Sequence, residues 1–261
     1  DRMKQRPIKI LVDALRTLGA EIQYPELEGF PPVRILGFAG QKAREVTIRG
    51  DVSSQYISAL MMIAPNLPQG LLIRFEGKVT SRPYLEMTAS LIRQFGASVN
   101  FNDAGIDIPH QKYTAATVTV ESDWSAASYW FAFTALAAQA EITLPNITLK
   151  SLQGDRVIVE IMNKLGVKAE LKGRDLLLTK KDHVTELGLD FTDCPDLAQT
   201  VAVVCAAKGI IGKFTGLESL RIKETDRIKA LQIELGKIGA SFTEKDGKWI
   251  LTPVSKEIPN G

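Results

Sequence analysis

The 261-residue chain has few of the residues that define cofactor or metal sites. Its only two cysteines, Cys194 and Cys205, form no disulfide framework and no metal-ligand spacing. Both are expected to be small buried hydrophobes in a reducing compartment such as the cytoplasm. Its two histidines, His110 and His183, stand in polar, loop-like sequence without a partner at metal-binding or catalytic spacing. Neither a zinc motif, a nucleophile elbow nor a glycine-rich nucleotide loop is present, so no metal site is expected.

Long apolar runs and an excess of one charge are also missing. No apolar run approaches the roughly 20 residues that span a bilayer, so no membrane segment is expected. The 32 cations nearly balance the 30 acids, and the net charge of +2 gives no support to a nucleic-acid or membrane surface. Any site for an anion must therefore be local.

What the sequence does contain is a long internal repeat. A helical segment that ends in a Gly-Ala or Gly-Val pair occurs four times, and its glycines, Gly19, Gly96, Gly166 and Gly239, lie 77, 70 and 73 residues apart. Each glycine is the expected helix stop, and a β-like run follows it. Because this period exceeds the roughly 20 to 50 residues of most solenoids, we predict that the repeating unit is a small subdomain.

Each period also holds a second helix that is apolar on nearly all sides and is therefore expected to be buried. These helices are predicted at 53–65, 125–138 and 195–207. Strands around them are predicted at 44–50, 70–77, 117–122 and 248–253. The predicted fold class is α/β, with βαβαββ units repeated in two domains. The chain begins inside one unit and stops where another apolar helix is due, so we expect a fragment that lacks both ends of a longer protein.

Two serine motifs stand at predicted helix starts. In GDVSSQY, Ser53 and Ser54 precede Gln55 where a helix N-terminus presents unpaired N–H groups and about half a positive charge, which suits a phosphate. In TSRPYLEM, Ser81 and Tyr84 flank a proline that suits a first helical turn. Simple capping of the helix by a serine is the alternative at both places.

Charged residues mark two further helix starts. Asp196 in DCPDLAQT begins an apolar helix, either as a cap or as a general base.

In ESLRIKETDRIKAL, Lys223 and Arg227 form a like-charge pair four residues apart on either side of Glu224. This pair is unfavourable by a few tenths of a kcal/mol. Charge-assisted hydrogen bonds to a bound phosphate or carboxylate, about 1.5–3 kcal/mol each, would offset this. A solvated helix start is the alternative. RMKQRP, with Arg2, has the same character.

In this order and at these separations, RMKQRP, GDVSSQ, SRPY, the Pro-Asp pair of DCPDLAQT and RIKETDR resemble the 5-enolpyruvylshikimate-3-phosphate synthase family over essentially the whole chain. The resemblance implies the enolpyruvyl transferase fold, incomplete here. It also implies a transferase of the shikimate pathway, the target of glyphosate. That enzyme moves the enolpyruvyl group of phosphoenolpyruvate to the 5-hydroxyl of shikimate 3-phosphate and releases phosphate, towards chorismate and the aromatic amino acids.

No cofactor and no nucleic-acid or membrane partner is implied, and a cytoplasmic monomer is expected. The implied substrate-binding residues are Arg2, Ser53, Ser54, Gln55, Ser81, Tyr84, Ser219, Lys223 and Arg227. Ser53, Ser54 and Ser81 would hold the shikimate phosphate. Arg2 and Arg227 would bind phosphoenolpyruvate. The family commonly has an asparagine at the position of Ser219, so the shorter serine leaves that shikimate contact in question.

The implied catalytic pair is Asp196, as the base for the attacking hydroxyl, and Glu224, as the acid that protonates the methylene carbon. An enol ether carbon becomes electrophilic only once its methylene is protonated, so an acid among cations suits this chemistry.

Residues 1–121 are expected to belong to the domain that binds shikimate phosphate, and residues 122–261 to the domain with the acid and base, with the substrates between them. Two alternatives stay open. One is UDP-N-acetylglucosamine enolpyruvyl transferase, which shares the fold. The other is a non-catalytic binding fragment that keeps the fold without the chemistry.

The family's N-terminal Lys-Ser motif, its Asn-Ala-Gly-Thr loop and its late Asp-His-Arg segment have no counterpart in this sequence. Three cationic side chains that bind substrate in the family are therefore also absent from this sequence. We therefore predict that the purified 261-residue chain alone has little or no synthase activity. Phosphate release measured with both substrates checks this, and robust turnover would contradict it.

Overall fold

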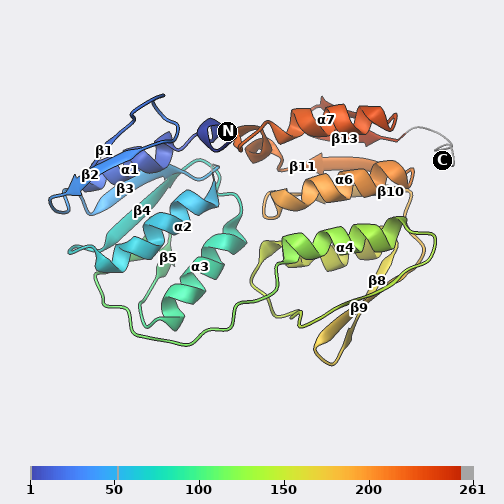
Figure 1. The fold of residues 1–261 in the computed structure, drawn as a ribbon, viewed down its shortest axis with the longest axis horizontal. Helices are drawn as coiled ribbons and strands as arrows, with labels where there is room; N and C mark the ends of the chain where they lie inside the picture. Colours follow the sequence, from blue (N-terminus) through green and yellow to red (C-terminus); the bar gives the residue numbers. More distant parts are fainter. Residues whose placement is uncertain (1, 52, 254–261) are drawn as a thin grey trace. The chain divides into compact units, whose positions relative to one another are not determined.

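The computed structural model describes residues 2–51 and 53–253, which divide into two compact units (Figure 1). Unit 1 contains the described residues up to Thr119 together with Glu218–Asp226, and unit 2 contains Val120–Leu217 and the described residues from Arg227 onward. The segment Glu218–Asp226, which was expected in the second domain, therefore packs with unit 1. The assignment of one substrate-binding domain and one acid and base domain stays a prediction.

Unit 1 opens with helical and strand elements that precede a complete repeat. These are η1 (Arg2–Gln5), α1 (Lys9–Leu18), β1 (Ala20–Gln23) and β2 (Arg34–Phe38). The complete βαβαββ repeat follows as β3 (Glu45–Arg49), α2 (Ser54–Ile63), β4 (Leu71–Glu76), α3 (Arg82–Gln94), β5 (Asn100–Asn102) and β6 (Gly105–Ile108), with the turn η2 (Ala64–Asn66) after α2. The sheet order is β3-β4-β6-β5, in which β3 and β4 are parallel and the other pairs antiparallel.

The core of unit 1 forms where these helices cover the sheet. The side chains of Val46 and Ile48 alternate with exposed residues along β3, so one face of this edge strand is apolar. Ile57, Leu60 and Met61 of α2 are completely buried in the same cluster. Since parallel strands need a crossover connection, α2 both joins β3 to β4 and contributes its apolar face to the core.

Unit 2 contains a partial repeat and a second complete one. The partial repeat consists of α4 (Trp124–Leu136), β7 (Glu141–Leu144), η3 (Gly154–Val157), α5 (Ile158–Lys164), β8 (Val167–Lys172) and β9 (Asp175–Lys180). The complete one consists of β10 (Glu186–Asp190), η4 (Pro195–Leu197), α6 (Ala198–Ala207), β11 (Ile211–Thr215), α7 (Arg227–Lys237), β12 (Ser241–Lys245) and β13 (Lys248–Thr252). Its sheet order, β10-β11-β13-β12, matches that of unit 1, and α4 packs beside α6 (Figure 1). The expected βαβαββ repeat is confirmed.

The glycines expected to stop the repeated helices do so. Gly19, Gly96, Gly166 and Gly239 all have φ between +79° and +112°, a left-handed conformation that glycine adopts without steric cost. These helix ends could be predicted from the sequence because a helix stop at glycine depends only on the local backbone conformation.

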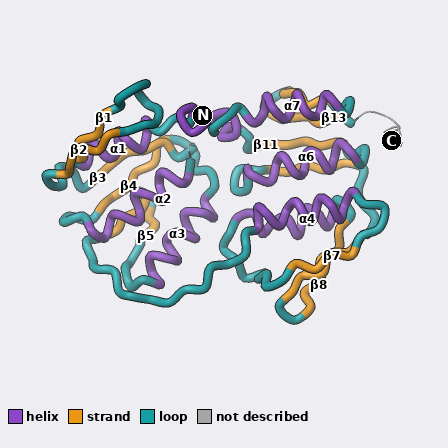
Figure 2. Tube along the Cα trace, viewed as in Figure 1, coloured by secondary structure: helices purple, strands orange, loops and turns teal. Residues whose placement is uncertain are grey.

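The strand predicted at residues 117–122 is wrong. Residues 109–123 form a loop (Figure 2), and Val120 is 90% exposed. The alternating Thr and Val residues favour an extended backbone, but a strand also needs a neighbour that pairs with it, which this segment lacks within the described chain.

The expectation that the apolar helices are buried is wrong for one side of α4. Tyr129, Trp130, Phe133 and Leu136 are between 43% and 61% exposed. An all-apolar helix is buried only where protein covers every side, and the described part of unit 2 covers α4 on one side, through α5, α6 and the sheet β7-β9-β8. None of the described helices combines the length and apolarity that a membrane crossing requires.

A pair of glycine substitutions in unit 1 separates backbone strain from steric clash. Both Gly19 and Gly77 have positive φ, but a Cβ atom on Gly19 would lie 2.5 Å from the Gly40 carbonyl oxygen, whereas one on Gly77 would meet nothing within 4 Å. We expect Gly77→Ala to lower the unfolding free energy by about 1 kcal/mol, the cost of the left-handed backbone alone. Gly19→Ala should lower it clearly further in urea denaturation, and equal losses would contradict the clash.

Candidate active site

The two complete repeats bring their helix-start loops together at one edge of each sheet. Because β3 and β4 are parallel, the loops that follow them leave the same edge of the sheet. Hydrogen bonds tie these loops, since the Thr80 amide donates to the Gly50 carbonyl (3.0 Å) and the Gly50 amide donates to the Glu76 carbonyl (2.9 Å). The parallel pair β10 and β11 gives unit 2 the same arrangement. Ligands of open α/β sheets bind at this edge.

Ser53 and Ser81 immediately precede α2 and α3, yet neither side chain caps its helix. By contrast, Asp123 caps α4 by accepting a hydrogen bond from the Ala126 amide at 3.1 Å. The capping alternative for the two serines is therefore wrong, and their hydroxyl groups are left for another partner at two helix N-termini. A helix N-terminus favours anions through its unpaired N–H groups.

Ser81 also carries backbone strain. Its φ of 54° and ψ of 34° lie in the left-handed region, and the residue is only 7% exposed. This conformation costs a non-glycine residue about 1–2 kcal/mol, which glycine would avoid. Backbone strain of this kind clusters at functional sites, so it supports a functional reason for a serine at this position.

A small cavity of about 70 Å³ in unit 1 brings predicted site residues together. It is lined by Arg6, Pro7, Lys9, Ile10, Ser53, Tyr56, Ser219, Ile222 and Lys223. Three cationic residues and two serines thus line the cavity beside the N-terminus of α2, and one of the cations, Lys9, already forms ion pairs with Asp13 (3.0 Å) and Glu28 (3.5 Å).

Two interactions hold the start of the chain against α2. Arg6 donates from Nη2 to Gln55 Oε1 at 2.6 Å, and the Tyr56 hydroxyl donates to the Pro7 carbonyl. Arg6 therefore lines the cavity, whereas Arg2, the residue singled out from the same motif, lies exposed in η1 and is not among its lining residues. The position of Arg6 directly before the proline that leads into α1 is the signal that could have indicated this.

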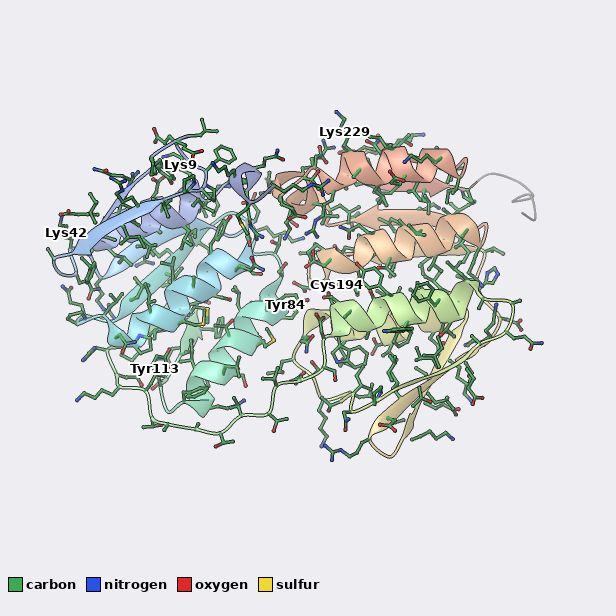
Figure 3. All side chains as sticks on the ribbon, in the orientation of Figure 1. Lys9, Lys42, Tyr84, Tyr113, Cys194 and Lys229 are labelled. Carbon is green, nitrogen blue, oxygen red and sulfur yellow. The ribbon has the colours of Figure 1, made fainter. Side chains whose placement is uncertain are left out.

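The remaining predicted residues of unit 1 lie around the same helix starts. Ser54 begins α2, and Tyr84 lies half-buried in the first turn of α3 (Figure 3). Ser219 is 6% exposed in η5 (Glu218–Ile222). Glu224 lies half-buried in the turn that follows η5 and lines neither this cavity nor the one described next.

A second cavity, of about 320 Å³, lies in unit 2 and is lined by Ser125, Tyr129, Asp196, Gln199 and Arg227. Arg227 donates from Nη1 to Asp196 Oδ1 at 2.8 Å. Because the two side chains are 26% and 42% exposed, the ion pair contributes only about 0–1 kcal/mol to stability. Asp196 caps neither η4 nor α6. The capping alternative is wrong here as well.

Polar groups that sequence reasoning missed line this second cavity. The Ser125 hydroxyl donates to the carboxylate of Asp155, a completely buried residue of η3. The Oε1 atom of Gln199 is shielded from solvent, and no hydrogen-bond donor reaches it from the described residues. An unpaired buried polar atom costs about 1–3 kcal/mol, so this oxygen calls for an explanation. Its spacing of three residues from Asp196 was the available signal.

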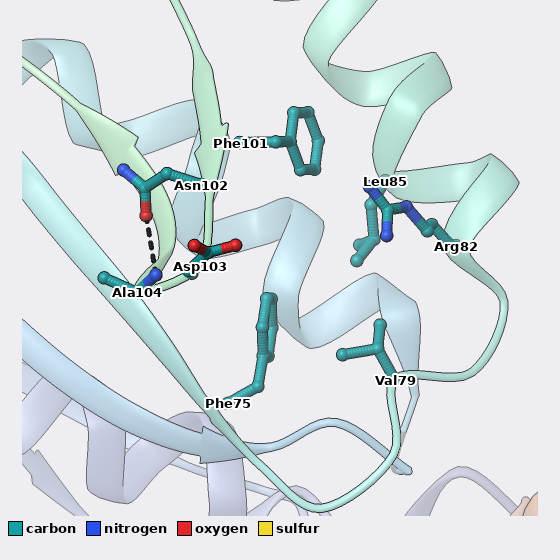
Figure 4. A pocket seen from close by; sticks show the side chains of 9 residues that line it. Phe75, Val79, Arg82, Leu85, Phe101, Asn102, Asp103 and Ala104 are labelled. Atoms are coloured by element: carbon teal, nitrogen blue, oxygen red, sulfur yellow. Dashed lines mark hydrogen bonds between the residues drawn. The ribbon is translucent and has the colours of Figure 1, made fainter.

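A third cavity, of about 340 Å³, contains none of the predicted site residues (Figure 4). The rings of Phe75 and Phe101 face it, and the guanidinium of Arg82 lies 5.8 Å from the centre of the Phe101 ring. Asn102 Oδ1 accepts a hydrogen bond from the Ala104 amide (2.9 Å), which fixes the turn at its rim.

Metal and thiol chemistry find no support at these sites. No group of three His, Cys, Asp or Glu side chains in the described part of the chain could hold a metal ion. Burial raises the pKa of both the Cys194 and the Cys205 thiols to about 12, so neither is an activated nucleophile.

Comparisons with known proteins identify the family. The model of the family EPSP synthase (3-phosphoshikimate 1-carboxyvinyltransferase) matches residues 1–260. A 3-phosphoshikimate 1-carboxyvinyltransferase of Bacteroides fragilis is 49% identical over 248 residues, which are 94% of this chain and 60% of that protein. The protein of the same name from Vibrio cholerae is 37% identical over 261 residues, covering 98% of this chain and 60% of that protein.

A solved structure of EPSP synthase from Acinetobacter baumannii matches with a TM-score of 0.67 and 21% identity, over 97% of this chain and 58% of that one. This likeness, with the two repeats of equal topology, defines the enolpyruvyl transferase fold. With the match over residues 1–260, the chain belongs to the EPSP synthase family. It spans about 60% of the length of the curated relatives it matches.

The burial of the two thiols predicts their reactivity. Because their pKa is raised to about 12, the thiolate fraction at pH 8 is far below that of free cysteine. We expect the native chain to react with a chromogenic disulfide reagent at least about a hundredfold more slowly than free cysteine, with both thiols reacting after unfolding in guanidinium. Fast reaction of either thiol in the native chain would contradict this burial.

Proposed function

We propose that this chain contributes to the transfer of the enolpyruvyl group of phosphoenolpyruvate to the 5-hydroxyl of shikimate 3-phosphate, with release of phosphate. The observation that carries the proposal is the pair of non-capping serines, Ser53 and Ser81, at neighbouring helix starts, with Ser53 on the wall of a cavity that Arg6 and Lys223 also line. Membership of the EPSP synthase family supports the same reaction. We propose the cytoplasm as its location and a monomer as its state.

In this proposal unit 1 binds shikimate 3-phosphate. Ser53, Ser54 and Ser81 hold the phosphate group, which the N-terminal ends of α2 and α3 favour electrostatically. Lys223 contacts the ring hydroxyls, and Ser219 stands beside it on the same cavity wall. The remaining two unit 1 positions of this site are Gln55, along the ring, and Tyr84, at its border.

Phosphoenolpyruvate is bound by guanidinium groups in this proposal, because planar donors suit its phosphate and carboxylate. Arg227 is one of them, and its ion pair with Asp196 sets the proposed base next to this cation. Arg2 is the other proposed donor.

The reaction then needs one acid and one base. Glu224 donates a proton to the methylene carbon of phosphoenolpyruvate, which makes the adjacent carbon electrophilic. Asp196 removes the proton of the 5-hydroxyl as its oxygen forms the new C–O bond. The tetrahedral intermediate loses a proton from its new methyl group, and the C–O bond to phosphate breaks, which restores the enol ether.

The role of Glu224 is tested in a full-length protein that carries these 261 residues. Glu224→Gln keeps the size of the side chain but removes the acidic proton, so we expect kcat to fall at least about a hundredfold. Steady-state phosphate release with both substrates measures it, and Glu141→Gln, at an exposed position of β7, is the matched control.

Unchanged turnover of Glu224→Gln would exclude the catalytic role. Saturation by the UDP-linked amino sugar instead of shikimate 3-phosphate would exclude the proposed substrate.

A further inference from the structure

The contact between Arg6 and Gln55 determines which end of the Gln55 amide faces a ligand. Arg6 Nη2 lies 2.6 Å from Gln55 Oε1. A guanidinium group carries N–H donors and no acceptor, so the end of the amide that faces Arg6 must be its carbonyl oxygen. The amide nitrogen of Gln55, with its two N–H donors, is thereby turned away from Arg6.

The backbone beside Arg6 is held by contacts of its own. The Pro7 carbonyl accepts a hydrogen bond from the Tyr56 hydroxyl. The Ile8 amide donates to the Gly29 carbonyl at 2.8 Å. The proline ring also fixes the backbone angle φ of the residue that follows Arg6. The guanidinium therefore approaches α2 from an anchored segment, and the amide is the partner that it orients.

Gln55 lies at the helix start where the proposed substrate binds. It is an exposed residue in the first turn of α2, directly after Ser54 and directly before Tyr56. Arg6, Ser53 and Tyr56 all line the same small cavity of unit 1. The oxygens of a phosphate accept hydrogen bonds, so a donor at this place attracts the substrate, whereas a carbonyl oxygen would repel it.

We propose that Arg6 is a positioning residue, which holds the amide of Gln55 so that Nε2 donates a hydrogen bond to bound shikimate 3-phosphate. This inference rests on the proposed function. In the alternative arrangement, Gln55 serves only to tether Arg6 and makes no bond to the substrate. Substitutions at the two positions distinguish these roles.

The first test compares Arg6→Gln with Arg6→Lys in a full-length protein that carries these 261 residues. Glutamine offers both a donor and an acceptor, so the amide of Gln55 is free to turn, whereas lysine has donors alone, as arginine does. We expect Arg6→Gln to raise KM for shikimate 3-phosphate about three- to tenfold, the loss of one hydrogen bond, with kcat within about twofold. Arg6→Lys should restore most of this loss.

Lys4→Gln is the matched control for the lost charge. It removes a positive charge from the same segment, but the Lys4 ammonium bonds to Glu26 at 2.7 Å and not to α2. We expect its KM to equal that of the unmodified protein. An increase as large as that of Arg6→Gln would overturn the positioning role, because net charge alone would then explain the effect.

The second test separates donation from tethering. Gln55→Glu keeps an acceptor for Arg6 and makes their bond charge-assisted, but it removes the donor. Gln55→Met removes the donor without adding a charge. We expect both to raise KM for shikimate 3-phosphate at least about threefold, and Arg6→Gln should add nothing to the effect of Gln55→Met. An unchanged KM in Gln55→Glu, or additive losses in the double variant, would overturn the inference.

Folding and function are checked separately. A thermal unfolding scan of each variant identifies any that fails to fold, and if Arg6→Gln is one of these, the two substitutions of Gln55 still decide. Turnover of both natural substrates by the unmodified protein tests the proposed function itself. With that turnover intact, an unchanged KM in Arg6→Gln overturns the role of Arg6 and leaves the proposed function standing.

Discussion

The parallel pairing of two strands in each complete repeat determines where the candidate site residues lie. A parallel pair must be joined by a crossover, so α2 and α6 return the chain across the sheet, and the next helix starts beside the previous one. Ser53 and Ser81 follow β3 and β4 in this way. The same constraint brings Asp196 and Arg227 together after β10 and β11, where their 2.8 Å contact is the direct consequence.

This edge also gathers groups that suit an anion. Arg6 and Lys223 line one small cavity together with Lys9, whose ammonium group already forms ion pairs with Asp13 and Glu28. The N-terminal end of α2 adds its partial positive charge to the same cavity. An anion bound there would accept charge-assisted hydrogen bonds from cations of this wall, which are stronger than bonds between neutral groups.

Much of the fold could be predicted because its signals are local. The repeat, its βαβαββ order and the helix stop at Gly19 depend on periodicity and on a single backbone conformation. The errors concern properties that depend on neighbours. Residues 117–122 have strand-like composition but no pairing partner, and the apolar side chains around α4, such as Phe133, are buried only where another element covers them. Likewise, the motif RMKQRP did not indicate that Arg6 contacts Gln55, because this contact depends on where α2 lies; the role of Arg2 stays a prediction.

Two local features of the candidate site are unfavourable for folding, and an ordinary substitution would remove each of them. Ser81 holds a left-handed backbone that glycine would adopt freely, and no donor among the described residues reaches the buried side-chain oxygen of Gln199. A glycine at the first position and an apolar side chain at the second would each remove a cost of folding. Both costs occur at the starts of helices whose remaining turns are firmly packed, so the helix body fixes a side chain that local energetics would leave free. A ligand that bonds to the Ser81 hydroxyl then gains from a group that is already ordered, because its conformational entropy is lost during folding and not during binding.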